Sequence, residues 1–184
     1  MESDRKKEVI NICLDHFISN GLETSTRSLS KALKLQNAGL YYYFESKDDA
    51  VIACAEAAAI RLENALLVPA LKDIGEPALM FTRLKSRADE MTPTMRFLVS
   101  VCVNGKYKER MKPALHRLDQ RYEHYADIIA EKLGCKKEDI EPYVYLVITA
   151  VANYMIFEED VFISSQMEIA KRAIKSFSKS SNVN

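Results

Sequence analysis

The sequence predicts an all-α protein of about nine helices, and three observations lead to this fold class. Glycine is scarce, with five residues in 184, and no stretch shows the strict apolar–polar alternation of a half-buried strand. Apolar residues recur instead at helical spacing along most of the chain. The prolines and the Asn-Gly pairs fall where such helices are expected to begin or end.

The first part of the chain is expected to form a compact head and the start of a long helix. Four helices are predicted here, over residues 4–19, 26–33, 37–43 and 47–68. Asn20-Gly21 suits the end of the first helix, because glycine adopts the left-handed conformation that closes helices. Ser46 is a good N-cap for the fourth helix, and Pro69 is expected to stop it.

The rest of the chain is expected to form a larger helical bundle. Five helices are predicted, over residues 77–89, 92–104, 113–133, 142–159 and 165–177. Thr92-Pro93 is interpreted as an N-cap followed by a first helical residue, so a break is expected there. Two domains follow from this organisation: residues 1–46, and residues 47–184 with a polar tail over 178–184.

Charge and cysteine content narrow the class of protein. Twenty-six basic residues balance 26 acidic ones, so any affinity for nucleic acid has to depend on local placement of charge. The four cysteines form no C-x-x-C pair, and buried free thiols in a reducing cytoplasm are expected, with a redox sensor as the alternative. They are Cys13, Cys54, Cys102 and Cys135.

Neither a membrane segment nor an enzyme site is predicted. The charged start of the chain does not resemble a signal peptide. The most apolar segment, 143–157, is interrupted by Thr149 and Asn153 and is expected to be a buried helix too short to span a bilayer. The three histidines, His16, His116 and His124, do not make a metal pair, and no nucleotide-binding or hydrolase motif occurs. We therefore expect no catalysis, no cofactor and no metal.

The segment Ser25–Lys47, S-T-R-S-L-S-K-A-L-K-L-Q-N-A-G-L-Y-Y-Y-F-E-S-K, is the most informative. Its apolar residues fall on one side of two short helices, and its polar and aromatic residues form the other side. Three adjacent tyrosines span about 200° of a helix, so at least one must face outward. This pattern is typical of a helix-turn-helix that reads a DNA major groove, and a three-helix cluster with plain core tyrosines is the alternative.

Residues 6–56 also resemble the DNA-binding domain of the TetR family of bacterial transcriptional regulators. The resemblance follows T-x-R-x-[LI], a turn, and L-Y-x-[HY]-F-x-[SN]-K, and it is supported by Phe17, Gly21, Arg27, Leu29, Leu40, Tyr41, Phe44, Ser46 and Lys47. Lys34 departs from the pattern, which has glycine in the turn, and Ala38-Gly39 departs from the usual G-[TSA]. A non-glycine at a position of positive φ costs on the order of 1 kcal/mol.

The resemblance implies a set of DNA contacts. Phosphate contacts are implied for Thr26, Tyr41 and Lys47, and a base contact for Arg27. The start of the recognition helix is implied at Gln36, Asn37, Ala38 and Gly39, with Tyr42 and Tyr43 meeting backbone or base edges. Double-stranded operator DNA is therefore the expected partner.

The resemblance further implies a homodimer and a small-molecule effector held in the rear bundle. For the dimer, the apolar last two helices offer Val144, Ile148, Val151, Met155, Ile169, Ala173, Ile174 and Phe177. The alternative is that helix 142–159 is simply central within one monomer. For the effector, an amphipathic or aromatic molecule is expected among Arg83, Met91, Phe97, Cys102, His116, Tyr122, Tyr125, Asn153 and Tyr154.

The prediction is thus a cytoplasmic, ligand-responsive repressor that binds a palindromic operator as a homodimer. Two rivals remain open. One is an all-α module whose head meets a protein partner, and the other is a helical protein that carries a lipid or another ligand.

Overall fold

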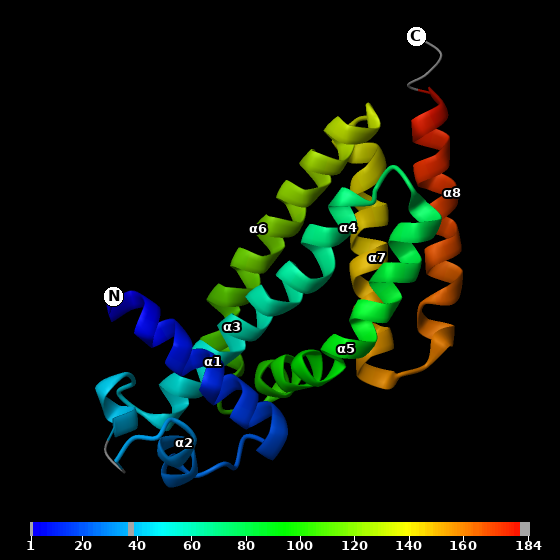
Figure 1. Ribbon diagram of the computed structural model, residues 1–184. Coiled ribbons are helices and arrows are strands. Elements are labelled where there is room, and N and C mark those ends of the chain that lie inside the picture. Colours follow the sequence, from blue (N-terminus) through cyan, green and yellow to red (C-terminus); the bar gives the residue numbers. More distant parts are fainter. Residues whose placement is uncertain (1, 37–38, 181–184) are drawn as a thin grey trace. The chain divides into compact units, whose positions relative to one another are not determined.

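The computed structural model describes residues 2–36 and 39–180, so the predictions for Asn37 and Ala38 lie outside the described residues. Over these residues every regular element is helical, which confirms the all-α class. The α-helices are α1 (Glu2–Asn20), α2 (Thr26–Ala32), α3 (Lys47–Leu62), α4 (Val68–Lys72), α5 (Pro77–Val103), α6 (Lys108–Leu133), α7 (Lys137–Phe157) and α8 (Ser164–Ser180) (Figure 1). Shorter elements are the 3-10 turns η1 (Gly39–Tyr42) and η3 (Asp160–Phe162) and the π-helical η2 (Glu63–Leu67).

The described residues hold seven continuous α-helical segments, because α3, η2 and α4 follow one another without a break. The prediction of about nine was therefore too high. The helix expected over 37–43 is described as the short 3-10 turn η1, and the helices expected over 77–89 and 92–104 are one helix, α5.

Four prolines predicted at helix boundaries lie inside helices instead, namely Pro69, Pro93, Pro113 and Pro142. Thr92 does not cap a new helix, since its buried hydroxyl donates to the carbonyl of Ala88, 3.1 Å away, and α5 continues through Pro93. Pro69 does not stop the helix that begins at Lys47. The π-helical turn η2 directly precedes this proline, and widened turns of this kind accommodate interruptions of the hydrogen-bond ladder.

The chain divides into two compact units, Met1–Arg61 with Pro93–Ala114, and Leu62–Thr92 with Leu115–Asn184. The first unit contains α1, α2, nearly all of α3, the second part of α5 and the first turns of α6. In it, Phe17 is stacked on Phe97 at a centroid distance of 6.0 Å. The domain boundary predicted at residue 46 stays a prediction.

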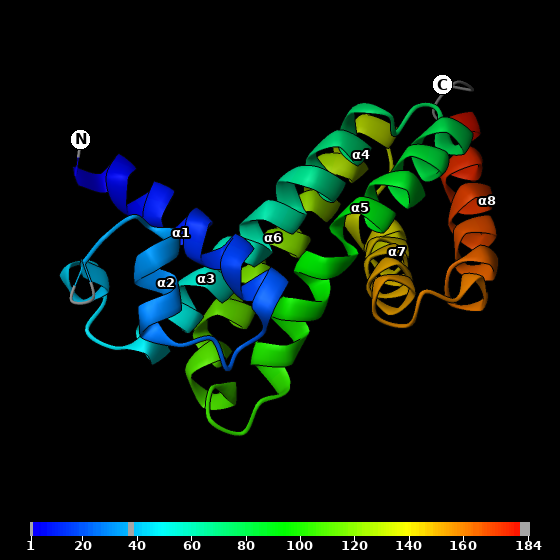
Figure 2. The same cartoon turned by 60° about the horizontal axis from the view of Figure 1, so that its bottom comes forward.

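In the second unit α7 and α8 run side by side, as Figures 1 and 2 show from two directions. Helix α7 begins at Lys137, earlier than expected, and its 21 residues are long and apolar enough to cross a membrane by length and composition. The helix is therefore longer than the segment 143–157 on which the expectation of a short span was based. Within the unit, one side of α7 is buried through Ile140, Val144, Val151 and Met155.

Candidate functional site

The head of the first unit contains α2, a tight turn and the short 3-10 turn η1, in the order expected for a helix-turn-helix. Leu29 and Leu40 are fully buried and Phe44 is 5 % exposed, so the apolar side predicted for this segment faces the core. Ser25 caps α2, because its hydroxyl accepts the N–H of Ser28 at 3.1 Å. Thr26 is half-buried and Arg27 is exposed in the first turn of α2, at the end where backbone N–H groups favour anions.

The turn after α2 has the two hydrogen bonds of a Schellman motif. The N–H of Leu35 donates to the carbonyl of Ser30 at 2.9 Å, and the N–H of Lys34 donates to that of Lys31 at 3.0 Å. Lys34 therefore occupies the left-handed position, with φ of +55°. A lysine stands where the geometry favours glycine, because the Cβ atom crowds the backbone in this conformation.

The 3-10 turn η1 presents two tyrosines to solvent. Tyr41 is 53 % exposed and Tyr42 is 76 % exposed, while Tyr43 is half-buried with its ring edge-on to that of Tyr42, 5.0 Å between centroids. The outward tyrosine required by the spacing argument is thus present. Gly39 has a packing role, because a Cβ atom there would lie 2.6 Å from the Cβ of Leu35.

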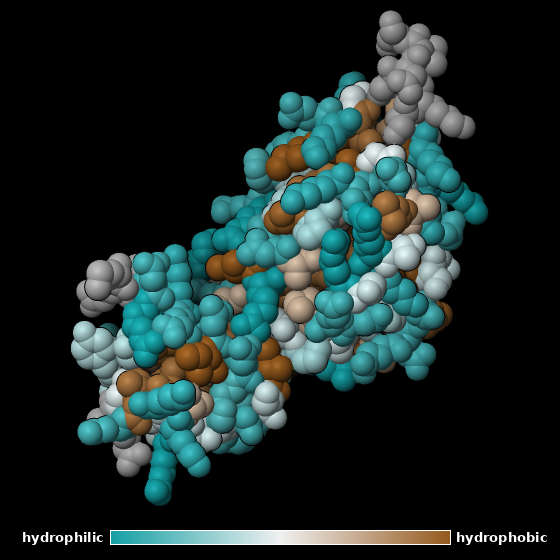
Figure 3. Space-filling model, in the orientation of Figure 1, coloured by the Kyte–Doolittle hydropathy of each residue, from teal (hydrophilic) through white to brown (hydrophobic). Residues whose placement is uncertain are grey.

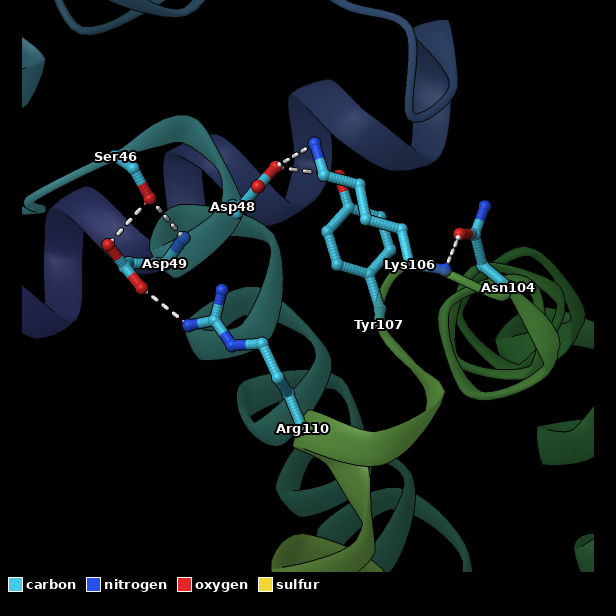
Figure 4. Close-up of polar contacts among 7 residues, drawn as sticks. All are labelled: Ser46, Asp48, Asp49, Asn104, Lys106, Tyr107 and Arg110. Atoms are coloured by element: carbon cyan, nitrogen blue, oxygen red, sulfur yellow. Dashed lines mark hydrogen bonds and ion pairs between the residues drawn. The ribbon is translucent and has the colours of Figure 1, made fainter.

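The first turn of α3 carries a network of charged and polar side chains, drawn in Figure 4. Ser46 accepts the N–H of Asp49 at 3.1 Å and donates its hydroxyl to the Asp49 carboxylate at 2.6 Å. The same carboxylate is paired with Arg110 of α6. Asp48 accepts the Tyr107 hydroxyl at 3.0 Å and pairs with Lys106 at 2.7 Å.

Both carboxyl groups have a pKa below the ordinary value. Lys106, foremost, holds the pKa of Asp48 down through its ion pair, and Ser46 followed by Arg110 does the same for the pKa of Asp49. Sequence reasoning missed Lys106, Tyr107 and Arg110, since Tyr107 and Arg110 lie 59 and 61 residues from their partners and no local pattern marks them.

The structure gathers the described members of the predicted DNA set in the first unit. They come from the start of α2 (Thr26, Arg27), the turn (Gln36), η1 (Gly39, Tyr41, Tyr42, Tyr43) and the first residue of α3 (Lys47). Gln36 is exposed and Lys47 is half-buried. The Lys47 ammonium and the Arg27 guanidinium can hydrogen-bond to DNA phosphates and to base edges. The exposed phenols of Tyr41 and Tyr42 can do the same.

The second unit contains a small apolar pocket of about 70 Å³. It is lined by the segment after α3 (Leu67, Ala70, Leu71, Ile74), by α5 (Met80, Leu84), by α6 (Tyr125, Ile129), by α7 (Ile140, Tyr143, Val144, Val147, Ile148) and by α8 (Ala170, Ile174). Figure 3 shows hydrophobic side chains at the surface over α4, among hydrophilic ones.

A buried polar group borders this pocket. The Tyr125 hydroxyl donates to the carboxylate of Glu63 at 2.6 Å, and the same carboxylate is paired with Arg121. Desolvation first, and then Glu63, raise the pKa of the Tyr125 phenol, so this hydroxyl stays protonated. Glu63 and Arg121 form an ion pair with each other, and neither side chain lines the pocket.

Of the effector residues predicted from sequence, only Tyr125 lines this pocket. Phe97 and Cys102 belong to the first unit, and Arg83 is exposed and ion-paired with Asp73 at 2.9 Å. The others lie elsewhere in the second unit. His116 is exposed, Met91 and Asn153 are half-buried, Tyr122 lies edge-on to Tyr145, and the Tyr154 hydroxyl donates to Asp89. The pocket therefore includes one member of the predicted set, and the set as an effector site stays a prediction.

Most of the residues predicted for a dimer interface are covered within the second unit. Five are buried, namely Val144, Val151, Met155, Ala173 and Ile174, and Ile148 lines the pocket. Ile169 is 49 % exposed, and Phe177 is half-buried, edge-on to Tyr143. Burial within one chain therefore accounts for most of this apolar stripe, and its role as a dimer interface stays a prediction.

No group of three or more His, Cys, Asp or Glu side chains in the described part of the chain is arranged to hold a metal ion.

Comparisons with known proteins support the fold. No family model and no curated protein matches the sequence. Among solved structures, a TetR-family regulator, PfmR from Thermus thermophilus, matches with a TM-score of 0.54 and 18 % identity over 93 % of this chain and 97 % of that one. A tetR-family regulator from Streptomyces coelicolor matches with a TM-score of 0.58 and 16 % identity over 95 % and 79 %.

A third structure, described as a candidate transcriptional regulator from Rhodococcus sp. RHA1, matches with a TM-score of 0.63 and 15 % identity over 91 % of each chain. At such identities the likeness concerns the course of the backbone. The chain has the fold of the TetR-family transcriptional regulators.

Proposed function

We propose that the protein is a sequence-specific DNA-binding transcriptional regulator. One observation carries the proposal: α2, the turn and η1 bring exposed Arg27, Tyr41 and Tyr42 to a surface that adjoins the start of α3 with Lys47. Phenol, guanidinium and ammonium groups are common donors to DNA phosphates and bases. The TetR-like fold is consistent with this role.

The residues divide into two roles. Tyr41, Lys47 and Thr26 contact phosphates, so they set affinity for any sequence. Arg27 and Gln36 face base edges, where a guanidinium pairs with guanine and a carboxamide with adenine, so they set sequence preference.

Selection of binding sites from random duplex DNA, followed by salt-dependent titrations, tests this assignment. Lys47→Ala should weaken binding to the selected site and to random DNA alike. It should also reduce the magnitude of the negative slope of log K against log salt by about one. Gln36→Ala should change the sequence preference and leave the slope unaltered. Wild-type protein with no preference for any selected site would refute the proposal.

We further propose that the protein acts as a homodimer in which a second copy covers the outer face of α7. Only 28 % of the residues in the most apolar stretch of this helix are buried within the chain. Leu146, Asn153 and Ile156 are half-buried and Thr149 is exposed, and their spacing of three and four places them on one outward stripe. Ile169 of α8 adds an exposed apolar side chain.

Sedimentation of variants tests the dimer. Thr149→Arg should yield a folded monomer, because a long charged side chain then stands in the centre of the stripe, while Gln120→Arg on exposed α6 should leave the dimer intact. A monomeric wild type at every concentration would contradict this interface.

We also propose that the pocket in the second unit holds an uncharged, mainly apolar effector, and that occupancy changes operator affinity. The lining supplies hydrocarbon side chains and the phenols of Tyr125 and Tyr143, and no charged side chain. A charged ligand would lose its hydration without gaining a partner. The proposed effector is thus smaller and more apolar than the amphipathic or aromatic molecule expected from the sequence.

Thermal-shift titrations with short aliphatic alcohols, aromatic hydrocarbons and carboxylic acids of matched size test the effector class. The neutral compounds should raise Tm and the ionised acids should not. Ala70→Leu should fill the pocket and abolish the shift, whereas Ala78→Leu, at the start of α5 and outside the pocket lining, should retain it. Stabilisation by the acids alone would contradict an apolar effector.

A further inference from the structure

The segment between α5 and α6 and the first turn of α6 are joined to the first turn of α3 by three side chains, Lys106, Tyr107 and Arg110. Lys106 and Tyr107 both reach the same oxygen, Oδ1 of Asp48, and Arg110 reaches Oδ1 of Asp49 (Figure 4). All of these residues lie in the first unit, so their contacts belong to one compact body. Two neighbouring carboxylates are thus held by three donors from a segment remote in sequence.

The donors themselves are held in place. Tyr107 is only 5 % exposed, so its ring is packed and its hydroxyl has little freedom. The backbone N–H of Lys106 donates to Oδ1 of Asn104 at 2.9 Å, and the N–H groups of Tyr107 and Lys108 donate to the Asn104 carbonyl at 3.0 and 2.9 Å. The Lys106 ammonium also lies 5.5 Å from the centroid of the Tyr107 ring. A turn fixed by Asn104 therefore presents the donors to α3.

The place where these contacts act is the start of α3. Lys47, the residue proposed to meet a phosphate, directly precedes Asp48 and Asp49 in sequence. Two unpaired carboxylates beside that lysine would repel the phosphates of DNA, and the repulsion between charges a few ångströms apart is screened only weakly. Pairing with Lys106 and Arg110 neutralises the two carboxylates and also fixes the turn that carries Lys47.

We propose that Lys106, Tyr107 and Arg110 are positioning residues for DNA binding, which neutralise and hold the first turn of α3 without contacting DNA themselves. This inference rests on the proposed function. It separates two kinds of basic residue in the first unit: Lys47 acts on the phosphates, whereas Lys106 and Arg110 act on Asp48 and Asp49.

The salt dependence of DNA affinity distinguishes the two kinds. A residue that contacts phosphate releases counterions, so its loss lowers the slope of log K against log salt, whereas loss of a positioning residue lowers affinity and leaves the slope unchanged. The probe is a fluorescent duplex carrying the site selected from random DNA by the full chain. Titrations are done over a range of KCl, at a temperature at which circular dichroism shows every variant folded.

Two variants remove the contacts without altering net charge. Tyr107→Phe removes one hydroxyl and keeps the packed ring, and Arg110→Ala combined with Asp49→Asn removes one ion pair. Each should weaken binding about threefold to tenfold at every salt concentration, with the wild-type slope. Arg110→Lys alone should stay within about twofold of the wild-type affinity, because it retains a cation opposite Asp49.

Two further variants are controls. Lys108→Ala removes a neighbouring exposed cation of the same segment and should stay within about twofold of wild type, since Lys108 is not among the residues that hold Asp48 or Asp49. Lys47→Ala should lower the slope.

Wild-type affinity in both charge-neutral variants, even with a lowered Tm, would show a purely structural role and overturn the inference. A lowered slope in Tyr107→Phe or in the double variant would also overturn it, because these residues would then contact DNA. Either result leaves the proposed function standing if Lys47→Ala behaves as described. Absence of DNA binding by the wild type overturns both proposals.

Discussion

Replacement of Lys34 by glycine should stabilise the protein, although it removes a side chain. Lys34 has φ of +55°, and its N–H and that of Leu35 close α2 through the carbonyls of Lys31 and Ser30. The left-handed conformation costs a residue with a Cβ about 1–2 kcal/mol. Glycine avoids that cost but gains about 0.5–1 kcal/mol of additional entropy in the unfolded chain. The expected net gain is about 0.5–1 kcal/mol, or a rise in Tm of about 1–4 °C for a chain of this size.

The same substitution three residues earlier supplies the control. Lys31 is exposed in α2, where helical φ is negative, so Lys31→Gly should destabilise by about 1 kcal/mol. Lys34→Ala keeps the Cβ atom and should be close to neutral, which separates backbone strain from loss of the charge. Urea and thermal unfolding monitored by circular dichroism measure all three variants. Equal destabilisation by Lys34→Gly and Lys31→Gly would refute the argument from strain.

Three further outcomes are expected. Gly39→Ala should destabilise by about 1–3 kcal/mol and weaken DNA binding, because its methyl group would lie 2.6 Å from the Cβ of Leu35; an unchanged Tm would contradict this packing. In the folded protein the pKa values of Asp48 and Asp49 lie below the ordinary 3.8. Their ion pairs therefore stabilise the fold above pH 3.8, and this stabilisation is lost as the pH falls through the folded-state pKa values. The double variant Asp48→Asn, Asp49→Asn should therefore be less stable than wild type at pH 7, and the two stabilities should converge in acid. Urea unfolding at a series of pH values measures this; a stability difference that does not change with pH would contradict stabilisation by these ion pairs. Cys13 and Cys54 are fully buried, so in mass-spectrometric labelling they should react with a thiol reagent only on unfolding, and labelling as fast as the other two cysteines would show that the head opens.

The helical class and the buried side of residues 25–47 were predictable because they depend on local patterns, whereas the helix expected over 37–43 is described as the 3-10 turn η1. The apolar side of residues 25–47 fixed which residues are buried, and Leu29, Leu40 and Phe44 are buried as that pattern requires. The continuous helix through Thr92-Pro93 was not predictable, because a threonine before proline fits an N-cap as well as it fits a helix interior. The outcome depended on the carbonyl of Ala88, which accepts the Thr92 hydroxyl in α5.

The buried and the outward side of α7 show a second limit of prediction from sequence. An apolar stripe on α7 predicted contact with something, but periodicity alone does not tell whether the neighbour belongs to the same chain. Val144, Val151 and Met155 turned out to be covered within the second unit, and the outward stripe with Thr149 is less apolar.

The sequence by itself determined that the chain is helical, where the head lies, and that tyrosines must emerge from it, since helical periodicity and turn chemistry act over a few residues. Only the tertiary structure decided which remote side chains meet. Asp48 and Asp49 are paired with Lys106 and Arg110, and Tyr125 adjoins Glu63, because packing brings together segments separated by about sixty residues. Such contacts depend on the mutual placement of whole helices, and no local spacing encodes it.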